Sequence, residues 1–207
     1  MNIFRNRIEG ACLIIYIKEG KQKFASLWTI WKNCDKILLT LFIGGGFVIA
    51  VKVICIGKLK ESYLRAACDE YTKRLARYCD FEVKQLPEVL ISENPSAAQI
   101  DAALKKEAEA IEREIPQGAY TVALCIEGKQ LSSPELAEKI EALASMGRGK
   151  ISFIIGSSFG LDAAFKERCD LRLSFSKMTF PHQLFRVLLC EQIYRAFSII
   201  NKSKYHK

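Results

Sequence analysis

The stretch LSFSKMTFPHQLFR, residues 173 to 186, combines three patterns: an apolar strand, a polar turn, and a Pro-His step that opens an amphipathic helix. A turn of this kind leaves backbone amides and polar side chains exposed beside buried residues. What the turn holds depends on where it lies in the fold, and the preceding sequence predicts that position.

The chain alternates between strand and helix patterns from residue 51 onward. Apolar runs predict strands at 51 to 56, 121 to 126 and 151 to 156, and an alternating pattern predicts another at 81 to 86. A fifth strand leads into the turn that begins at Ser174. Helical spacing follows from 60 to 79, a capping box at Ser96 to Gln99 opens a helix, and Ser132 to Glu135 opens another. The pattern predicts an α/β fold with a mostly parallel sheet covered on both faces.

Ligands of such sheets bind in the loops that follow the carboxyl ends of the strands. Three loops therefore become candidates for the functional site. They follow Leu124 to Ile126, begin at Gly156, and run from Ser174 to Pro181.

The composition fits one domain of a cytoplasmic protein. With 207 residues, half of them hydrophobic, the chain can bury one good core. Eight cysteines without a C-x-x-C pair, and only two histidines, suggest neither a zinc site nor a disulfide framework. We expect reduced cytosolic thiols and no metal.

The net charge of +8 is unevenly distributed. Residues 174 to 207 contain six Lys and Arg but only one acid, Glu191, while the stretch from 48 to 173 is nearly balanced. A basic C-terminal face suits a polyanionic partner, although a basic run is also common on ordinary solvated surfaces.

Residues 1 to 47 form a distinct N-terminal segment, followed by a domain at 48 to 207. The uncharged run ILLTLFIGGGFVIAV, residues 37 to 51, is shorter than the roughly 20 residues that span a bilayer. One hypothesis is a signal anchor flanked by Lys32 and Lys36, which makes a membrane-anchored binding module an alternative function. The hypothesis we favour is a misannotated start, with Val48 as the product of a GTG start codon.

Ser158 suggests another alternative, because Gly156 to Gly160 fits the pattern G-x-S-x-G after a predicted strand. A serine hydrolase places its nucleophile in this context and needs an acid and a histidine within reach. In the usual chain order of serine, acid and histidine, the aspartates between Ser158 and His182 are Asp162 and Asp170. The competing explanation is that the glycines permit a tight turn.

The run LSFSKMTFPHQLFRVLLCEQIYRAFSIINKSKYHK closely resembles the C-terminus of the ribosomal RNA large subunit methyltransferase H family, pseudouridine-N3 methyltransferases of the SPOUT class. VKVICIGKLKESY, from residue 51, resembles the opening strand and turn of that family, and IEGKQLSS, from residue 126, resembles its central motif. The resemblance covers residues 49 to 207. The first 47 residues have no counterpart in that family.

This resemblance implies a Rossmann-like sheet with a C-terminal trefoil knot of the SPOUT type, in which S-adenosyl-L-methionine is bound. Ser157 stands where many members of the family have a second glycine. The residues implied as cofactor contacts are Leu124, Gly156, Phe175, Ser176, Lys177, Met178, Thr179 and Phe180.

The resemblance also implies a role for the end of the chain. Its last residues resemble the family's C-terminal tail, which reaches into the active site. His182, Arg186 and Tyr205 are the candidates for substrate binding, by stacking or phosphate contact. His206, Tyr205 and Arg195 are the candidates for catalysis, where a proton must leave the ring nitrogen.

The implied reaction is methylation of N3 of a pseudouridine in 23S rRNA within the assembled ribosome, by a homodimer whose subunits complete each other's pocket. Direct displacement at a sulfonium carbon requires neither a metal nor a covalent intermediate. We expect no membrane association of the domain at 48 to 207.

Overall fold

A computed structural model describes residues 3–8, 11–16, 49–203 and 205. The chain divides into two compact units, Met1–Gly44 and Gly45–Lys207. In the first, β1 (Ile3–Ile8) and β2 (Ala11–Tyr16) pair antiparallel as a hairpin. The apolar run of the anchor hypothesis lies outside the described residues except for its last three positions. None of the helices that are described is long and apolar enough to cross a membrane.

The second unit is built on a five-stranded, all-parallel sheet of strand order β4-β3-β6-β5-β7, which confirms the predicted α/β class. β6 lies between β3 and β5, so strands far apart in sequence become neighbours. The strands are β3 (Ala50–Ile56), β4 (Asp80–Leu86), β5 (Tyr120–Gln130), β6 (Lys150–Ile155) and β7 (Leu171–Ser174).

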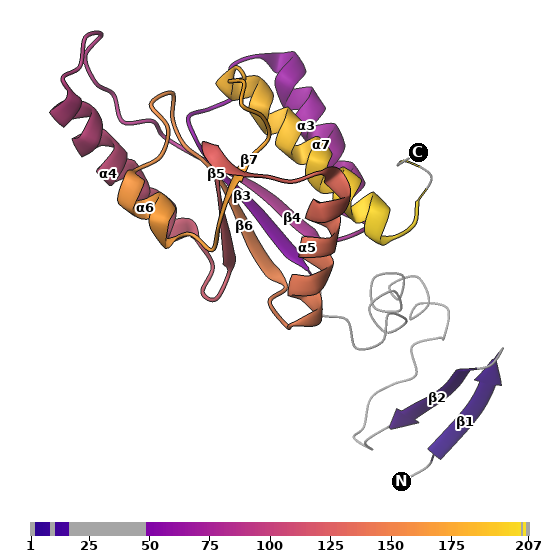
Figure 1. Cartoon of the computed structure of the whole chain (residues 1–207). Helices are drawn as coiled ribbons and strands as arrows, with labels where there is room; N and C mark the ends of the chain where they lie inside the picture. Colours follow the sequence, from indigo (N-terminus) through magenta and orange to yellow (C-terminus); the bar gives the residue numbers. More distant parts are fainter. Residues whose placement is uncertain (1–2, 9–10, 17–48, 204, 206–207) are drawn as a thin grey trace, which may run out of the picture. The chain divides into compact units, whose positions relative to one another are not determined.

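Helices cover both faces of this sheet (Figure 1). One layer contains α3, α7 and α5, and the other contains α4 and α6. Their bounds are α3 (Ser62–Leu75), α4 (Ala97–Glu114), α5 (Ser133–Ser145), α6 (Ala163–Arg168) and α7 (His182–Ile200). The capping boxes at the starts of α4 and α5 are both formed, by Ser96 with Gln99 and by Ser132 with Glu135.

The central strands are apolar without interruption because both of their faces are buried. In β3, Val53 and Cys55 belong to the core beneath α3, α5 and α7. The alternate residues Ile54 and Ile56 belong to the core beneath α4 and α6. The alternation of side chains along a strand thus supplies two cores from one run.

Gly128 allows β5 and β7 to cross closely at the edge of the sheet. A Cβ atom at this position would lie 2.6 Å from the backbone of Leu173 and 2.7 Å from that of Arg172. The register between the strands shifts here, since Leu173 pairs with both Leu124 and Lys129. Only glycine fits such an approach, and the shift brings residues 125 to 127 beside the end of β7.

Helix α7 begins at the carboxyl edge of the sheet and packs against both α3 and α5. On the α3 side, Arg77 Nη2 donates to Tyr194 Oη at 2.9 Å. On the α5 side, Ser133 Oγ donates to Gln192 Oε1 at 2.7 Å. The C-terminal half of α7 is therefore held on both sides by side-chain hydrogen bonds.

Candidate functional site

The three predicted loops meet at the carboxyl edge of the sheet and enclose a pocket of about 380 Å³. Its walls are residues 124–127 of β5, residues 155–161 at the end of β6 and in the turn after it, and residues 173–176 and 178–180 at and after β7. Lys166 of α6, and His182 and Phe185 from the first turns of α7, complete the lining. The volume is within the range of pockets that bind cofactors and drug-sized ligands.

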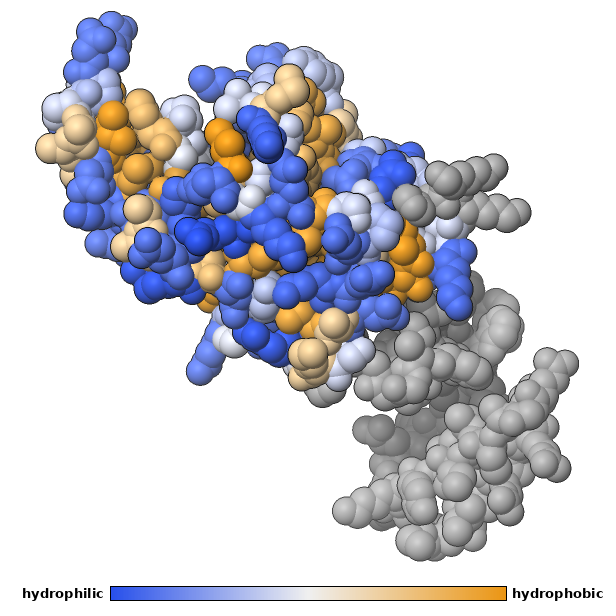
Figure 2. All heavy atoms as spheres, in the orientation of Figure 1, coloured by the Kyte–Doolittle hydropathy of each residue, from blue (hydrophilic) through white to orange (hydrophobic). Residues whose placement is uncertain are grey.

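Apolar side chains reach the surface of this unit among larger hydrophilic areas (Figure 2). Four of the large exposed ones line the pocket: Met178 is 74% exposed, Ile126 55%, Phe159 47% and Phe180 40%. Concentration of uncovered apolar side chains in one concave site is typical of a surface that a ligand covers.

A tight turn forms the wall after β6. Ser157 N donates to Gly160 O at 3.1 Å, and Gly160 N donates back to Ser157 O at 3.0 Å. Gly160 has a φ of 95°, which favours glycine. A Cβ atom on Gly156 would lie 2.0 Å from Gly160 O, so the turn itself excludes any side chain there.

His182, the first residue of α7, contacts this turn through its side chain. Its Nε2 lies 2.6 Å from the carbonyl oxygen of Gly156. A carbonyl oxygen only accepts, so Nε2 carries the proton in this contact. Burial lowers the pKa of His182, which favours the neutral ring at neutral pH, although the hydrogen bond opposes the shift.

The segment after β7 folds back on itself through its two serines. Ser174 Oγ donates to Ser176 O at 2.9 Å, and Met178 N donates to Ser176 Oγ at 3.0 Å. Phe175 packs edge-on against Phe185 with ring centroids 4.9 Å apart. These contacts hold the apolar side chains of the segment from residue 173 to 180 along one wall of the pocket.

Seven of the eight residues expected to contact the cofactor line this single pocket. Lys177 is the exception, since it is exposed at the tip of the turn and is not part of the lining. The other seven are Leu124, Gly156, Phe175, Ser176, Met178, Thr179 and Phe180. Their contact with the cofactor stays a prediction.

Sequence reasoning missed several lining residues, among them Ile126, Phe159, Phe185 and the pair Glu127 and Lys166. Lys166 Nζ lies 2.5 Å from Glu127 Oε1, and this contact lowers the pKa of Glu127. Phe185, Ile126 and Glu127 were detectable, because they lie within two of the three motifs that carry the family resemblance.

Arg186 lies in the interior, with only 1% of its surface exposed. Its Nη2 donates to the carbonyl oxygen of Ile56 at 2.5 Å, and its Nη1 donates to Gln85 Oε1 at 3.5 Å. Within one chain the guanidinium therefore binds the carboxyl ends of β3 and β4, next to the loops that follow them. It does not line the pocket, and substrate contact stays a prediction.

Arg195 and Tyr205 lie at the other end of α7. Glu191 Oε1 accepts from Arg195 Nε at 2.9 Å and from Tyr205 Oη at 3.2 Å, and the Arg195 guanidinium lies 4.9 Å from the centre of the Tyr205 ring. Burial and the neighbouring Tyr71 and Glu191 raise the pKa of Tyr205 to about 12. His206 lies outside the described residues.

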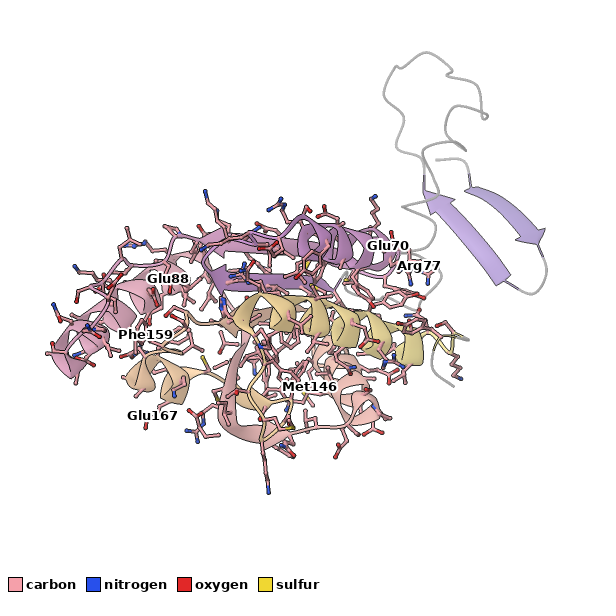
Figure 3. All side chains as sticks on the ribbon, turned by 90° about the horizontal axis from the view of Figure 1, so that it is seen from above. Glu70, Arg77, Glu88, Met146, Phe159 and Glu167 are labelled. Atoms are coloured by element: carbon pink, nitrogen blue, oxygen red, sulfur yellow. The ribbon has the colours of Figure 1, made fainter. Side chains whose placement is uncertain are left out.

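One chain does not bring this group to the pocket. Ten residues of helix separate Phe185 from Arg195, a rise of about 15 Å. Figure 3 shows Glu88 and Phe159 at one end of the domain and Arg77, which bonds to Tyr194, at the other. The predicted cofactor contacts that line the pocket and two of the predicted catalytic residues, Arg195 and Tyr205, therefore form two separate groups.

The geometry does not support a hydrolase. Ser158 Oγ donates to Glu88 Oε1 at 3.2 Å, while the His182 ring contacts the Gly156 carbonyl. Asp162 instead caps α6 by accepting from Phe165 N at 2.7 Å. The three groups needed for a catalytic triad are therefore engaged elsewhere.

A pocket at the carboxyl edge of a parallel sheet, with a glycine turn and apolar walls, defines an α/β protein that binds a small organic ligand. The family described as predicted SPOUT methyltransferase matches residues 49–206. The chain belongs to this SPOUT methyltransferase family, which confirms the assignment made from its motifs.

The most similar relatives agree with this assignment. The chain is 47% identical to the ribosomal RNA large subunit methyltransferase H of Limosilactobacillus reuteri (strain DSM 20016) over 157 residues, covering 76% of this chain and 99% of the relative. It is 48% identical to the protein of that name from Leuconostoc mesenteroides, with the same coverage. A probable methylase family protein from Haemophilus influenzae Rd KW20 aligns with a TM-score of 0.43 and 15% identity, covering 76% and 70% of the two chains.

Proposed function

We propose that this protein uses S-adenosyl-L-methionine to methylate N3 of a pseudouridine in 23S rRNA, and that it acts on the assembled ribosome. The observation that carries the proposal is that two of the family motifs, the one from residue 126 and the C-terminal run from residue 173, meet the Gly156 turn around one pocket. Relatives of nearly equal length to the domain, at 47% and 48% identity, are named as large-subunit rRNA methyltransferases. A ribosomal substrate also implies a cytoplasmic enzyme.

The pocket suits the cofactor. An adenine ring needs apolar cover and a few backbone hydrogen bonds, and exposed apolar walls lie beside the amides of two turns. Leu124, Phe175 and Met178 would cover the ring, while the backbone around Gly156 would approach its polar edge. S-adenosylmethionine supplies a methyl group on a positively charged sulfur.

The residues of the chain have two tasks in this reaction. The pocket must hold the methyl donor in line with the ring nitrogen and exclude water, because alignment accounts for much of the rate of such a displacement. A second group must remove the proton from N3 as the bond forms. We assign the second task to the tail group of Arg195, Tyr205 and His206.

The separation of the two groups supports a homodimer. Arg195 lies about 15 Å along α7 from Phe185 in the pocket of its own chain, and Tyr205 lies beside Arg195. A second copy can supply both residues across an interface. Leu184 on α7 is exposed, and Val187 and Leu188 are only partly buried. These side chains are available for an interface between subunits.

We also propose that the C-terminal segment is threaded as a trefoil knot. The chain leaves β7 at the sheet edge, passes the loop of β5 at residues 125 to 130, and returns as α7 between α3 and α5. The close passage of β5 and β7 at Gly128 is compatible with such a path.

The test is the nucleoside content of 23S rRNA from cells that lack the gene. We expect 3-methylpseudouridine to be lost and to return when residues 48 to 207 are supplied. Purified protein should methylate 70S ribosomes from the deletion strain and leave free 23S rRNA unmodified. Persistence of 3-methylpseudouridine in a strain without a second such enzyme would refute the substrate assignment.

A further inference from the structure

The pocket contains an ion pair to which the proposed reaction gives no task. Lys166, on α6, donates from Nζ to Glu127 Oε1 at 2.5 Å. Glu127 belongs to the stretch of β5 where the register with β7 shifts. Both residues line the pocket, so the pair joins two of its walls.

Among the described residues that line the pocket, Glu127 and Lys166 alone carry a full charge at neutral pH. Burial lowers the pKa of His182, which favours its neutral ring. Burial also raises the pKa of Cys125, so this thiol keeps its proton. The charged part of the site therefore consists of one acid and one base in contact with each other.

The exposure of the pair makes it a weak structural tie. The Glu127 side chain is 53% exposed and the Lys166 side chain 21%, and ion pairs that water reaches add little to stability. A ligand that covered the pair would exclude this water, which strengthens every charge interaction in the site. The location and exposure of the pair thus suit contact with a ligand better than support of the fold.

The cofactor of the proposed reaction has a charged end that matches this pair. Its adenine ring is neutral, whereas its amino-acid end carries an ammonium group and a carboxylate on one carbon atom. The apolar side chains proposed to cover the ring offer no partner to these two groups. A lysine ammonium donates to a carboxylate, and a glutamate accepts from an ammonium group. Two adjacent charges on the protein can therefore meet two adjacent charges of opposite sign on the ligand.

We propose that Lys166 and Glu127 bind the amino-acid end of S-adenosylmethionine, with Lys166 Nζ on its carboxylate and the Glu127 carboxylate on its ammonium group. The pair then makes the pocket prefer a cofactor with an intact amino acid over adenosine compounds that lack one. The inference rests on the proposed function, since it takes S-adenosylmethionine as the ligand of the pocket.

The first experiment measures, by calorimetry on the full chain, the affinities for two ligands that share adenosine and an uncharged sulfur. S-adenosylhomocysteine has the amino-acid end, and methylthioadenosine lacks it. We expect Lys166→Met and Glu127→Gln each to weaken S-adenosylhomocysteine binding about tenfold, because a hydrogen bond between charged groups is lost. Binding of methylthioadenosine should stay within about twofold of the native value, since the pair supports the fold little.

Two exposed residues that do not line the pocket provide matched controls. Lys129 lies on β5 with Glu127, and Glu167 lies on α6 next to Lys166 (Figure 3). Lys129→Met and Glu167→Gln remove the same charges from the same two elements, and both ligands should bind within about twofold of the native affinity. An equal loss of S-adenosylhomocysteine affinity in these controls would assign the effect to net charge and overturn the inference.

The second experiment separates the two contacts with decarboxylated S-adenosylmethionine, which keeps the ammonium and sulfonium groups. Lys166→Met should change its binding by no more than about twofold, since no carboxylate is present, whereas Glu127→Gln should still weaken it about tenfold. S-adenosylhomocysteine has no sulfonium charge. A loss with Glu127→Gln that is absent for S-adenosylhomocysteine would place Glu127 at the sulfur and overturn its assignment to the ammonium group.

Other outcomes distinguish the inference from the proposed function. Equal losses for S-adenosylhomocysteine and methylthioadenosine would show that the pair only shapes the pocket, and no loss for either would show that it has no part in binding. Each result would overturn the inference. If one variant does not fold, the other decides. A native protein that binds no S-adenosylmethionine contradicts the proposed function, whereas native binding that is independent of Lys166 and Glu127 contradicts only the role of the pair.

Discussion

The two ends of α7 are built in different ways. At its start, the pocket depends on backbone turns whose shape is fixed by short hydrogen bonds and by glycine, as at Gly156 and Gly160. At its end, Arg195, Glu191 and Tyr205 form a group of charged and aromatic side chains. The first end contributes to the pocket, and the second carries two of the residues to which we assign the removal of the proton.

This difference suggests a division of labour within a single helix. Binding of the cofactor should depend on one chain, whereas methyl transfer should depend on both ends of α7 and hence on two chains. Changes at the two ends should therefore have separable effects on affinity and turnover.

The largest effect is expected from Gly156→Leu. Any side chain at this position meets the carbonyl of Gly160, since even a Cβ atom would lie 2.0 Å from that oxygen. The turn must open, and we expect S-adenosylmethionine affinity to fall about 100-fold or more, equivalent to about 3 kcal/mol. Calorimetry measures this directly.

Gly118→Ala is the matched control for that substitution. Gly118 has a φ of 75° and no atom within 4 Å of an added Cβ, so alanine is strained there but meets nothing. We expect a loss of about 1–2 kcal/mol in stability with the affinity unchanged. Equal loss of affinity in both variants would show that the turn has no special role.

A chain that ends after Lys204, and so lacks Tyr205, His206 and Lys207, tests the other end. We expect its affinity for S-adenosylmethionine to equal that of the full chain. Its turnover on ribosomes should fall by about 100-fold or more, because proton transfer groups contribute at least this factor. Normal turnover would show that the tail takes no part in methyl transfer.

Mixed dimers sharpen the comparison between the ends. Co-expression of Gly156→Leu chains with Arg195→Ala chains should restore about one quarter of the native activity, because half of the dimers are mixed and each holds one intact site. Each variant alone should be inactive. If no activity returns while mixed dimers are present, both ends must act within one chain.

The smallest effect is expected from removal of residues 1 to 47. A chain that starts at Val48 keeps every described residue of the pocket and of α7. We expect its affinity for S-adenosylmethionine to match that of the full chain within about twofold. Soluble truncated protein that shows neither heat nor a thermal shift with the cofactor would contradict this division of the chain.

The strands and the position of the pocket were predictable from local sequence. Uninterrupted apolar runs such as 51 to 56 and 151 to 156 become central strands, because both of their faces are buried. Parallel strands end at the same edge, so the loops after them had to lie close together. The proposed knot and the cofactor were inferred only from the family resemblance.

The buried positions of Arg186 and Glu107 were not predictable from local sequence. Both are charged residues within helices, where such residues usually face solvent. Each is buried because of partners distant in the chain: Ile56 for Arg186 and the loop after β4 for Glu107. Sequence periodicity contains no information about these contacts, and the same holds for the close passage at Gly128.

The position of β6 between β3 and β5 has a consequence for protein synthesis. Domains begin to fold from the N-terminus as the chain emerges, but here β3 and β5 have no shared partner until β6 has been made. The wall formed by residues 173 to 180 appears later still. An unfinished chain therefore has no complete pocket, and we expect the enzyme to become active only after it has left the ribosome that made it.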